Sequence, residues 1–395
     1  MKDLKHMYYF EKLLESCDNE LVRQAISDGR VPIGYTCSFT PEPILNMDKA
    51  FGVRLRAPLT GSTSVATYYL SNFVCSYTRS ILERAIEGGY KFLGGFRASE
   101  TCSQMTRCPE HFELLNLMDN DKFFVDWLDY PKKIDEYSIK STTQQIRDKF
   151  LKPMAENYGI DISKEALIKS VNEHNEMNAI LREISEFRKE ESPKVTGTEF
   201  HTLYLVSRAC PRDLIIGPLR ETLEEIKERV PDDKNSYRVR VVVAGSEIDD
   251  PSFIKLIEDQ GALVVADRFC YGAYPSIEHI ELTSEDPFED IVRHDINIRQ
   301  CPRMMDGDGR RQQYVVDLVE EFNADGIIYE SMKFCDYWGY ERAVASTDIA
   351  KKYNIPCVCI EREYTMSGAG QIRTRVQAFI ESLEIKKIQR KVRVK

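Results

Sequence analysis

Long apolar segments are lacking in this sequence of 395 residues. No stretch approaches the roughly 18 uncharged apolar residues that suggest a membrane-spanning helix, so we expect no membrane partner. The first twenty residues, MKDLKHMYYFEKLLESCDNE, have no long apolar core of the kind found in secretory signals, and their pattern predicts an acidic amphipathic helix. We therefore expect a cytoplasmic protein.

An excess of basic residues is also lacking. The net charge is −10, and the single basic block is the C-terminal KKIQRKVRVK. Proteins that bind nucleic acid usually carry a basic patch or stripe, whereas a short basic tail is more often a solvated chain end. The sequence thus predicts no nucleic-acid partner.

Phosphate-binding glycine loops are missing as well. The small-residue segments GSTS (61–64) and AGSE (244–247) match neither a Walker A loop nor G-x-G-x-x-G. ATP binding within this chain has no support.

The chain has eleven cysteines but no C-x-x-C pair. This spacing argues against zinc fingers and ribbons, thioredoxin-type sites and bacterial-type ferredoxins. Disulfides are a poor explanation in a reducing compartment. A metal site in this protein would have to collect its ligands from loops that are distant in the sequence.

What is present is a globular composition, with 42% apolar residues, and short strands that alternate with helices. We expect an α/β protein with two Rossmann-like or flavodoxin-like parallel-sheet domains, a helical N-terminus and a helical connector. The predicted boundaries are 1–30 for the N-terminal helical segment, 31–137 for the first α/β domain, 138–235 for the connector and 236–395 for the second α/β domain.

Several details of these elements are also predicted. The segment YKFLGGF (90–96) is typical of a strand, and the β-branched run VRVVV suits a buried parallel strand. In the connector, Thr142 or Thr143 is a candidate cap for one helix and Ser163 for the next.

Five cysteines lie where ligands bind in parallel sheets, namely near the carboxyl ends of strands or in loops between elements. They are Cys75, Cys102, Cys270, Cys301 and Cys335. Small buried thiols elsewhere often serve only in packing. We assign that role to Cys17, Cys37, Cys210, Cys357 and Cys359, while Cys108 stays open.

Four segments of the chain carry a family resemblance: FVCSYTRSILERAI, ASETCSQMTR, MKFCDYWGYER and IPCVCIEREYTMSGAGQIRTRVQAFIESL. They resemble, in order and spacing, the D-component family of 2-hydroxyacyl-CoA dehydratases and benzoyl-CoA reductases. That family includes double-cubane cluster proteins. The resemblance extends over nearly the whole chain.

The resemblance implies a [4Fe-4S] cluster held by Cys75, Cys102 and Cys335 in the cleft between the domains. Thiolates are soft ligands suited to such clusters, and three of them leave one iron open. The segments DRFCYG and QCPRMM also resemble family motifs. Their cysteines, Cys270 and Cys301, either carry a second cubane, giving an [8Fe-9S] double cubane, or line the cleft without metal. Cys108 is a further candidate for the second cubane.

Three polar residues open the last predicted helix after SGAG: Gln371, Arg373 and Arg375. Helix N-termini and arginines both favour anions, so these residues are candidate contacts for a CoA phosphate. A purely structural role, with Glu361 and Glu363 as ion-pair partners, is the alternative.

The function implied by the resemblance is that of an iron–sulfur subunit of a dehydratase or reductase. Its implied partners are an ATP-dependent iron–sulfur activator, a second homologous subunit or a second copy of the chain, and an acyl-CoA thioester or small-molecule substrate. One departure matters: the segment RAPLTGSTSVA has no carboxylate where catalytic dehydratase subunits often have Glu or Ser for the substrate hydroxyl. The alternatives are a double-cubane reductase of small molecules and a non-catalytic electron-transfer subunit.

Overall fold

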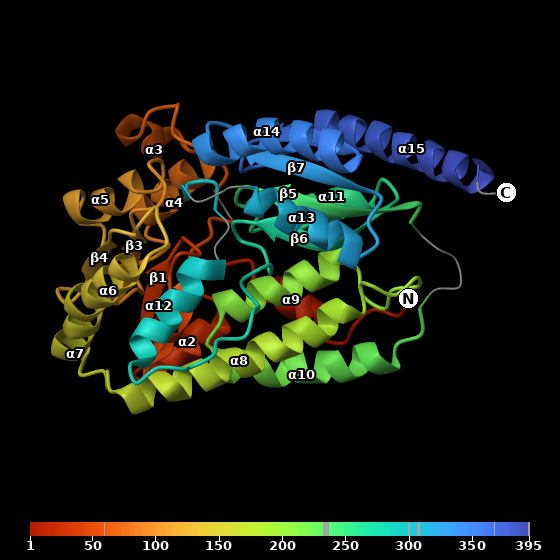
Figure 1. Cartoon of the computed structure of the whole chain (residues 1–395). Coiled ribbons are helices and arrows are strands. Elements are labelled where there is room, and N and C mark those ends of the chain that lie inside the picture. Colours follow the sequence, from red (N-terminus) through yellow and green to blue (C-terminus); the bar gives the residue numbers. More distant parts are fainter. Residues whose placement is uncertain (59, 232–236, 299–300, 306–308, 367, 394–395) are drawn as a thin grey trace.

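The computed structural model describes residues 1–58, 60–231, 237–298, 301–305, 309–366 and 368–393. Within these residues the strands form two parallel sheets with helices around them (Figure 1). The first sheet has the order β2-β1-β3-β4 and the second the order β6-β5-β7-β8. The strands are β1 (Val31–Tyr35), β2 (Ala50–Arg54), β3 (Gly95–Ser99), β4 (Phe124–Leu128), β5 (Val239–Gly245), β6 (Ala262–Phe269), β7 (Gly326–Met332) and β8 (Cys357–Arg362).

The two sheets repeat one topology, 2-1-3-4, which is the flavodoxin-like order. The predicted fold class, two parallel-sheet α/β units with a helical N-terminus, is confirmed. In such a sheet the chain reverses its direction of winding between the first and third strands. Ligands bind in the crevice that this reversal leaves at the carboxyl ends of the strands.

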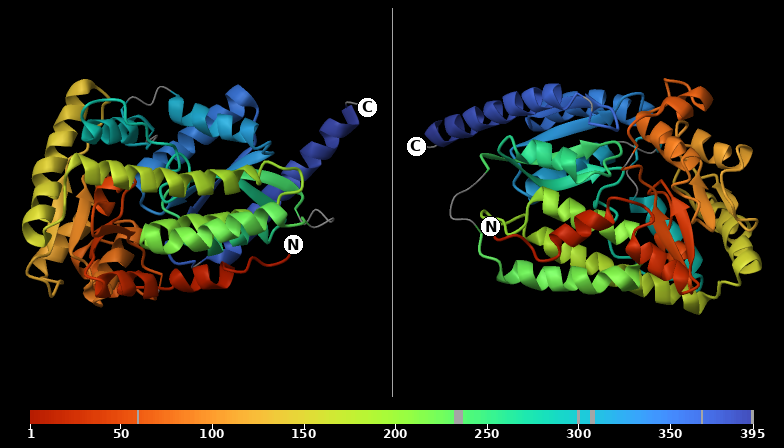
Figure 2. Two further views of the ribbon diagram at one scale, coloured as in Figure 1. Left: turned by 90° about the horizontal axis from the view of Figure 1, so that it is seen from below. Right: turned by 180° about the vertical axis from the view of Figure 1, so that it is seen from behind.

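The helices cover the faces of the sheets and join them, as the views from below and behind also show (Figure 2). Those before the second sheet are α1 (Met7–Leu13), α2 (Glu20–Ser27), η1 (Glu42–Asn46), α3 (Ser64–Tyr69), α4 (Ser76–Ile86), α5 (Arg107–Leu114), α6 (Glu136–Gln145), η2 (Ile146–Leu151), α7 (Lys152–Tyr158), α8 (Lys164–Glu186), α9 (Gly197–Ala209) and α10 (Arg212–Glu228). The later ones are α11 (Pro251–Glu258), α12 (Pro287–Ile298), α13 (Arg310–Glu321), α14 (Asp336–Tyr353) and α15 (Ala369–Arg393). No helix among the described residues is both long and apolar enough to cross a membrane.

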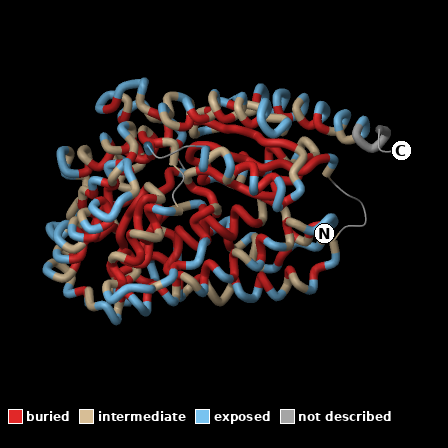
Figure 3. The backbone as a smooth tube through the Cα atoms, viewed as in Figure 1, coloured by how far each residue is buried: buried red, intermediate tan, exposed pale blue. Residues whose placement is uncertain are grey.

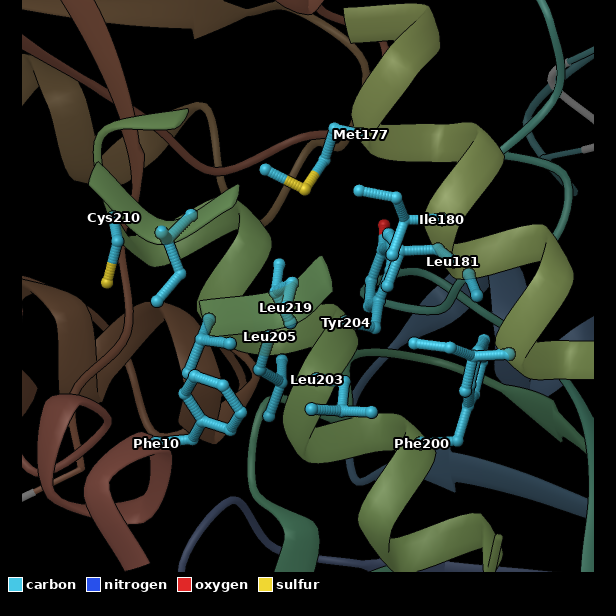
Figure 4. Packing of buried hydrophobic residues seen from close by; sticks show 14 of the residues in the cluster. Phe10, Met177, Ile180, Leu181, Phe200, Leu203, Tyr204, Leu205, Cys210 and Leu219 are labelled. Carbon is cyan, nitrogen blue, oxygen red and sulfur yellow. The ribbon is translucent and has the colours of Figure 1, made fainter. Parts of the chain in front are cut away.

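The connector helices form a hydrophobic core of their own with α1. Phe10, Leu181, Phe200 and Leu205 are among its buried side chains (Figure 4). Helix α9 contacts both β2 of the first sheet and β6 of the second. The connector therefore fixes the two sheets relative to each other, rather than only linking them along the chain.

Of the two helix caps predicted in the connector, one is confirmed and one is wrong. Ser163 caps α8, with its side chain accepting from the backbone N–H of Ala166 at 3.2 Å. The predicted cap at Thr142 or Thr143 is wrong because α6 starts earlier, at Glu136, with Asp135 as its N-cap; the Asp135 carboxylate accepts from the backbone N–H of Ser138 at 2.7 Å. Both threonines lie buried inside the helix.

The strand predicted at residues 90–96 starts only at Gly95. The preceding residues make a turn instead, in which the buried Tyr90 donates its hydroxyl to the backbone carbonyl of Arg56 at 2.7 Å. A tertiary hydrogen bond thus holds Tyr90, one of the aromatic residues that gave this segment its strand-like composition.

Six of the eight strands are buried throughout, whereas the edge strands β4 and β8 are partly exposed. Figure 3 shows the buried strands as red tubes through the centre of the molecule. Every residue of β5 is buried, as its β-branched run predicts. Helix α12 packs against α6 and α8, and its apolar side chains Phe288, Ile291 and Ile296 join the core beneath the first sheet. Residues late in the sequence thus complete the hydrophobic core beneath the first sheet. The domain boundaries at residues 31, 138 and 236 stay predictions.

Candidate metal centre

Six cysteines line one cavity at the carboxyl ends of the two sheets. The first half of the chain supplies Cys37, Cys75 and Cys102, and the second half supplies Cys270, Cys301 and Cys335. The space open to water inside this cavity is about 100 Å³. All five cysteines that the sequence placed in ligand loops are among the six.

Strand ends position four of these thiols. Cys37 and Cys102 follow β1 and β3, the two strands at the switch point of the first sheet. Cys270 directly follows β6, and Cys335 follows β7. Because all strands of a parallel sheet end at one edge, cysteines far apart in the sequence meet there.

Two of the thiols occupy helix N-termini. Cys75 is the N-cap of α4 and Cys335 the N-cap of α14. The positive end of a helix dipole favours a thiolate, which is the form that binds metal. Phe334, which precedes the N-cap residue Cys335, has a φ of 65°, a left-handed conformation that is rare for a bulky residue.

One amide joins the segments that carry Cys75, Cys102 and Cys335. The Gln104 Oε1 accepts from the backbone N–H of Cys75 at 3.2 Å, and its Nε2 donates to Asp336 Oδ2 at 3.1 Å. Gln104 therefore links a loop of the first sheet to the start of α14 in the second.

We divide the six thiols into two groups of three, which adjoin one another: Cys335 also raises the pKa of Cys270, and Cys37 also raises that of Cys102. In the first triad, Cys75, Cys102 and Cys335, burial raises the pKa of Cys335 well above its usual value, and the adjacent Cys102 and Cys75 thiols add to the rise. Burial also raises the pKa of Cys102 to about 12, with Cys75 contributing. The structure thus brings the predicted main ligand set together.

The second triad consists of Cys37, Cys270 and Cys301. Burial raises the pKa of Cys270 well above its usual value, and Glu247, Cys301, Cys335 and Cys37 add to the rise. Two donors point at its sulfurs: Trp338 Nε1 donates to Cys270 Sγ at 2.9 Å, and Thr101 Oγ1 donates to Cys37 Sγ at 3.0 Å.

Comparison with known proteins gives the context for these triads. The model of the family "2-hydroxyglutaryl-CoA dehydratase, D-component" matches residues 37–383. The chain belongs to this family. The match begins at Cys37 and includes all six cavity cysteines.

Curated relatives of this D-component chain are dehydratase and reductase subunits. It is 25% identical over 376 residues to the (R)-phenyllactyl-CoA dehydratase beta subunit of Clostridium sporogenes, covering 95% of this chain and 97% of the relative. It is 22% identical over 393 residues to a benzoyl-CoA reductase subunit of Thauera aromatica, covering 95% and 97%. The (R)-2-hydroxyglutaryl-CoA dehydratase beta subunit of Acidaminococcus fermentans is 21% identical over 329 residues, covering 80% and 82%.

Cys37 is the cavity cysteine that sequence reasoning missed, since we assigned it to packing. Its position just after the carboxyl end of β1 is the signal that could have identified it. The remaining cysteines do not line the cavity. Cys108, which we left open, is fully buried in α5 against the core of the first sheet.

Among the described residues, three charged side chains line the cavity of this D-component chain: Arg54, Arg268 and Glu247. Burial raises the pKa of Glu247 to about 8, although Arg54 opposes the rise. Glu247 follows β5 and gives the cavity a carboxyl group, which the segment after β2 lacks. Its place after a buried parallel strand was the sequence signal for it.

The predicted anion contacts lie elsewhere. Gln371 and Arg375 line a separate hollow of about 150 Å³ beside Lys333, and Arg373 is exposed outside it. Arg375 Nη2 donates to the backbone carbonyl of Cys359 at 2.8 Å. The suggested acidic partners form other ion pairs: Glu361 lies 3.6 Å from Arg342, and Glu363 lies 3.6 Å from Lys333.

The donor set fits an iron–sulfur cluster better than a single ion. Among the described residues, no three His, Cys, Asp or Glu side chains converge closely enough to hold one metal ion. A cubane is wider, and its thiolates bind different irons, so its cysteines are spaced further apart. Six cysteines with no histidine around an otherwise mostly apolar cavity match the soft, all-thiolate ligation of such clusters.

Proposed function

We propose that this D-component chain is a low-potential iron–sulfur subunit whose six cavity cysteines hold two cubanes, together an [8Fe-9S] double cubane. The observation that carries the proposal is the convergence of all six thiols on one cavity. Each triad would bind one cubane through three thiolates and leave one iron for a bridging sulfide. Such a cluster supplies one-electron reduction at low potential.

The partners of the chain follow from this role. A separate ATP-dependent iron–sulfur activator would deliver the electron to the cleft between the sheets, since this sequence has no nucleotide-binding loop of its own. The relatives named above are subunits, which supports a second homologous subunit or a second copy of this chain as a further partner. All eleven cysteines are free thiols, as a reducing compartment favours, and the cytoplasm is the compartment we propose.

For the substrate, the cavity favours a small molecule. Its open space is about 100 Å³, compared with roughly 300–1,000 Å³ for pockets that enclose drug-sized ligands, and the proposed clusters would take up part of it, so only a small molecule could bind beside them. A reductase of small molecules is therefore our first candidate. Glu247 supports a catalytic role over mere electron relay, because a buried carboxyl group beside the thiols can hold and release a proton.

A subunit of an acyl-CoA dehydratase is the second candidate. Its support is the phenyllactyl-CoA dehydratase beta subunit, which this chain matches over 97% of that relative's length. In that case most of the acyl thioester would have to remain outside the cavity.

Anaerobic purification followed by iron and sulfide counting tests the proposal. We expect about eight irons per chain, whereas about four would indicate a single cubane and overturn the double-cubane proposal. Folded protein without iron would overturn the metal site itself. Cys335→Ser should lose iron, and tight binding of CoA thioesters would favour the second candidate over the first.

A further inference from the structure

Charge is distributed unevenly around the two triads. Arg54, at the end of β2, reaches across to the second sheet, and its Nη2 donates to the backbone carbonyl of Cys270 at 2.7 Å. Its guanidinium lies 3.8 Å from the centre of the Tyr271 ring. A cation from the first sheet is thus fixed against the second triad.

The Arg54 guanidinium is incompletely compensated. It is 1% exposed, and its Nε and Nη1 have no hydrogen-bond partner among the described residues. Its carboxylate neighbour, Glu247, lies at 3.5 Å, beyond the roughly 2.7–2.9 Å of a strong charge-assisted bond. Glu247 stabilises the charged form of Arg54, and the unused donors of this buried cation would stabilise further negative charge placed nearby.

Further cations surround the same triad. Arg268 lines the cavity with its guanidinium 5.5 Å from the ring of Trp338. Arg303 is two residues from Cys301, is buried, and donates to the backbone carbonyl of Tyr130 at 2.8 Å.

The first triad has a different environment. The cavity wall beside it is formed by uncharged side chains such as Tyr77, Met105 and Met332. The cation that acts on Cys75, Arg79, is not part of this wall and lies 3.9 Å from the carboxylate of Glu363. Thr78 Oγ1 lies 3.2 Å from Cys75 Sγ as a neutral hydrogen-bonding partner. Arg54 and Arg268 are the cations that line the cavity among the residues the structure describes, and Arg54 contacts the second triad directly.

We propose that Arg54 and Arg268 make the second triad the high-potential end of the cavity, so that an added electron would reside on the cubane that Cys37, Cys270 and Cys301 would hold. The inference rests on the double-cubane function proposed above. With both cubanes bound, such a transfer would oxidise the cubane at the first triad and reduce the one at the second by one electron, with no change of bond or proton. The arginines stabilise the added negative charge, because charge interactions are strong in a buried, weakly screened site.

The test is an anaerobic redox titration of the eight-iron protein, followed by electron paramagnetic resonance. Wild type should show two separate one-electron steps. Arg54→Gln should lower the upper step by a tenfold or larger change in equilibrium constant, which is about 59 mV for one electron. Arg54→Lys keeps the charge and should stay near wild type. Thr78→Val, the matched change at the first triad, should move only the lower step.

Two further variants show which triad gives which reduction step and provide a substitute for Arg54→Gln. Cys37→Ser should lose the second cubane and therefore retain only the lower reduction step. Arg268→Gln repeats the charge removal if Arg54→Gln fails to fold. An upper step that neither arginine variant moves, or equal shifts of both steps, would overturn the inference while leaving the double cubane intact. A count of four irons in wild type would instead overturn the proposed function.

Discussion

Trp338 donates its indole N–H to the Sγ of Cys270 at 2.9 Å. Trp338 lies on α14, and the N-cap of that helix is Cys335. A single helix therefore contacts both triads: it presents a thiol of the first and a hydrogen-bond donor to the second. The first turn of α14 therefore connects the two halves of the cavity.

This contact makes Trp338 an internal reporter of cluster loading. The sequence has two tryptophans, Trp127 and Trp338, and only Trp338 lines the cavity. Anaerobic reconstitution with iron and sulfide should quench most of the Trp338 emission. Fluorescence of the Trp338→Phe and Trp127→Phe variants separates the two signals. Quenching confined to Trp127 would contradict the location of the site.

Cys37 should be as important for iron binding as the cysteines identified from the sequence. Cys37→Ser is expected to reduce the iron content from about eight to about four per chain, since one triad loses a thiolate. Elemental analysis with a labile-sulfide assay measures this change. Cys359→Ser is the matched control because Cys359 lies on β8 outside the cavity. Equal iron in wild type and Cys37→Ser would remove Cys37 from the ligand set.

A buried ionic network should contribute strongly to stability where the connector meets the first sheet. Glu42 Oε2 lies 2.7 Å from Arg208 Nη1 and 3.6 Å from Arg212 Nη2. Glu42→Gln would leave two buried cations without their carboxylate, and the free energy of unfolding should fall by about 3–5 kcal/mol. Urea denaturation measures it. The exposed Glu221, paired with Lys5, is the control, and Glu221→Gln should leave the denaturation midpoint unchanged. Similar midpoints for both variants would contradict the prediction.

Acid should destabilise the chain partly through His201. Burial, reinforced by Arg56, lowers the pKa of this histidine to about 3, whereas an unfolded histidine titrates near 6.5. Between these values the unfolded state binds the extra proton, so stability is lost as pH falls from about 6.5 towards 3, at up to about 1.4 kcal/mol per pH unit. His201→Phe should flatten this loss. Urea midpoints from pH 8 to pH 4 test it, and parallel curves for the two proteins would count against it.

The sequence could predict the architecture because its signals are local. Runs such as VRVVV and GIIYE are apolar enough to be buried on both faces, and helices separate them, so a parallel α/β fold follows. The same logic placed Cys102, Cys270 and Cys335 at strand ends. Parallel strands then required these thiols to gather at the edge where the sheets end.

The site residues that we did not predict are identified by contacts between the two halves of the chain. Cys37 follows an apolar strand, so we took it for a packing thiol; its position after the end of β1 is a weak signal by itself, and the facing Cys270 and Cys301 give it weight. Arg54 ends a buried strand, and its partner is a backbone carbonyl more than two hundred residues later. Sequence spacing contains no information on which loops of two separate sheets face each other.

Each triad draws thiols from both sheets, and this has a consequence for biosynthesis. The first triad needs Cys335 in addition to Cys75 and Cys102, and the second needs Cys270 and Cys301 in addition to Cys37. A ribosome that has released only the first sheet has therefore exposed three of the cavity cysteines, but neither triad is complete. Under the proposed function, iron and sulfide can be inserted only after nearly the whole chain has been synthesised and its two halves have met.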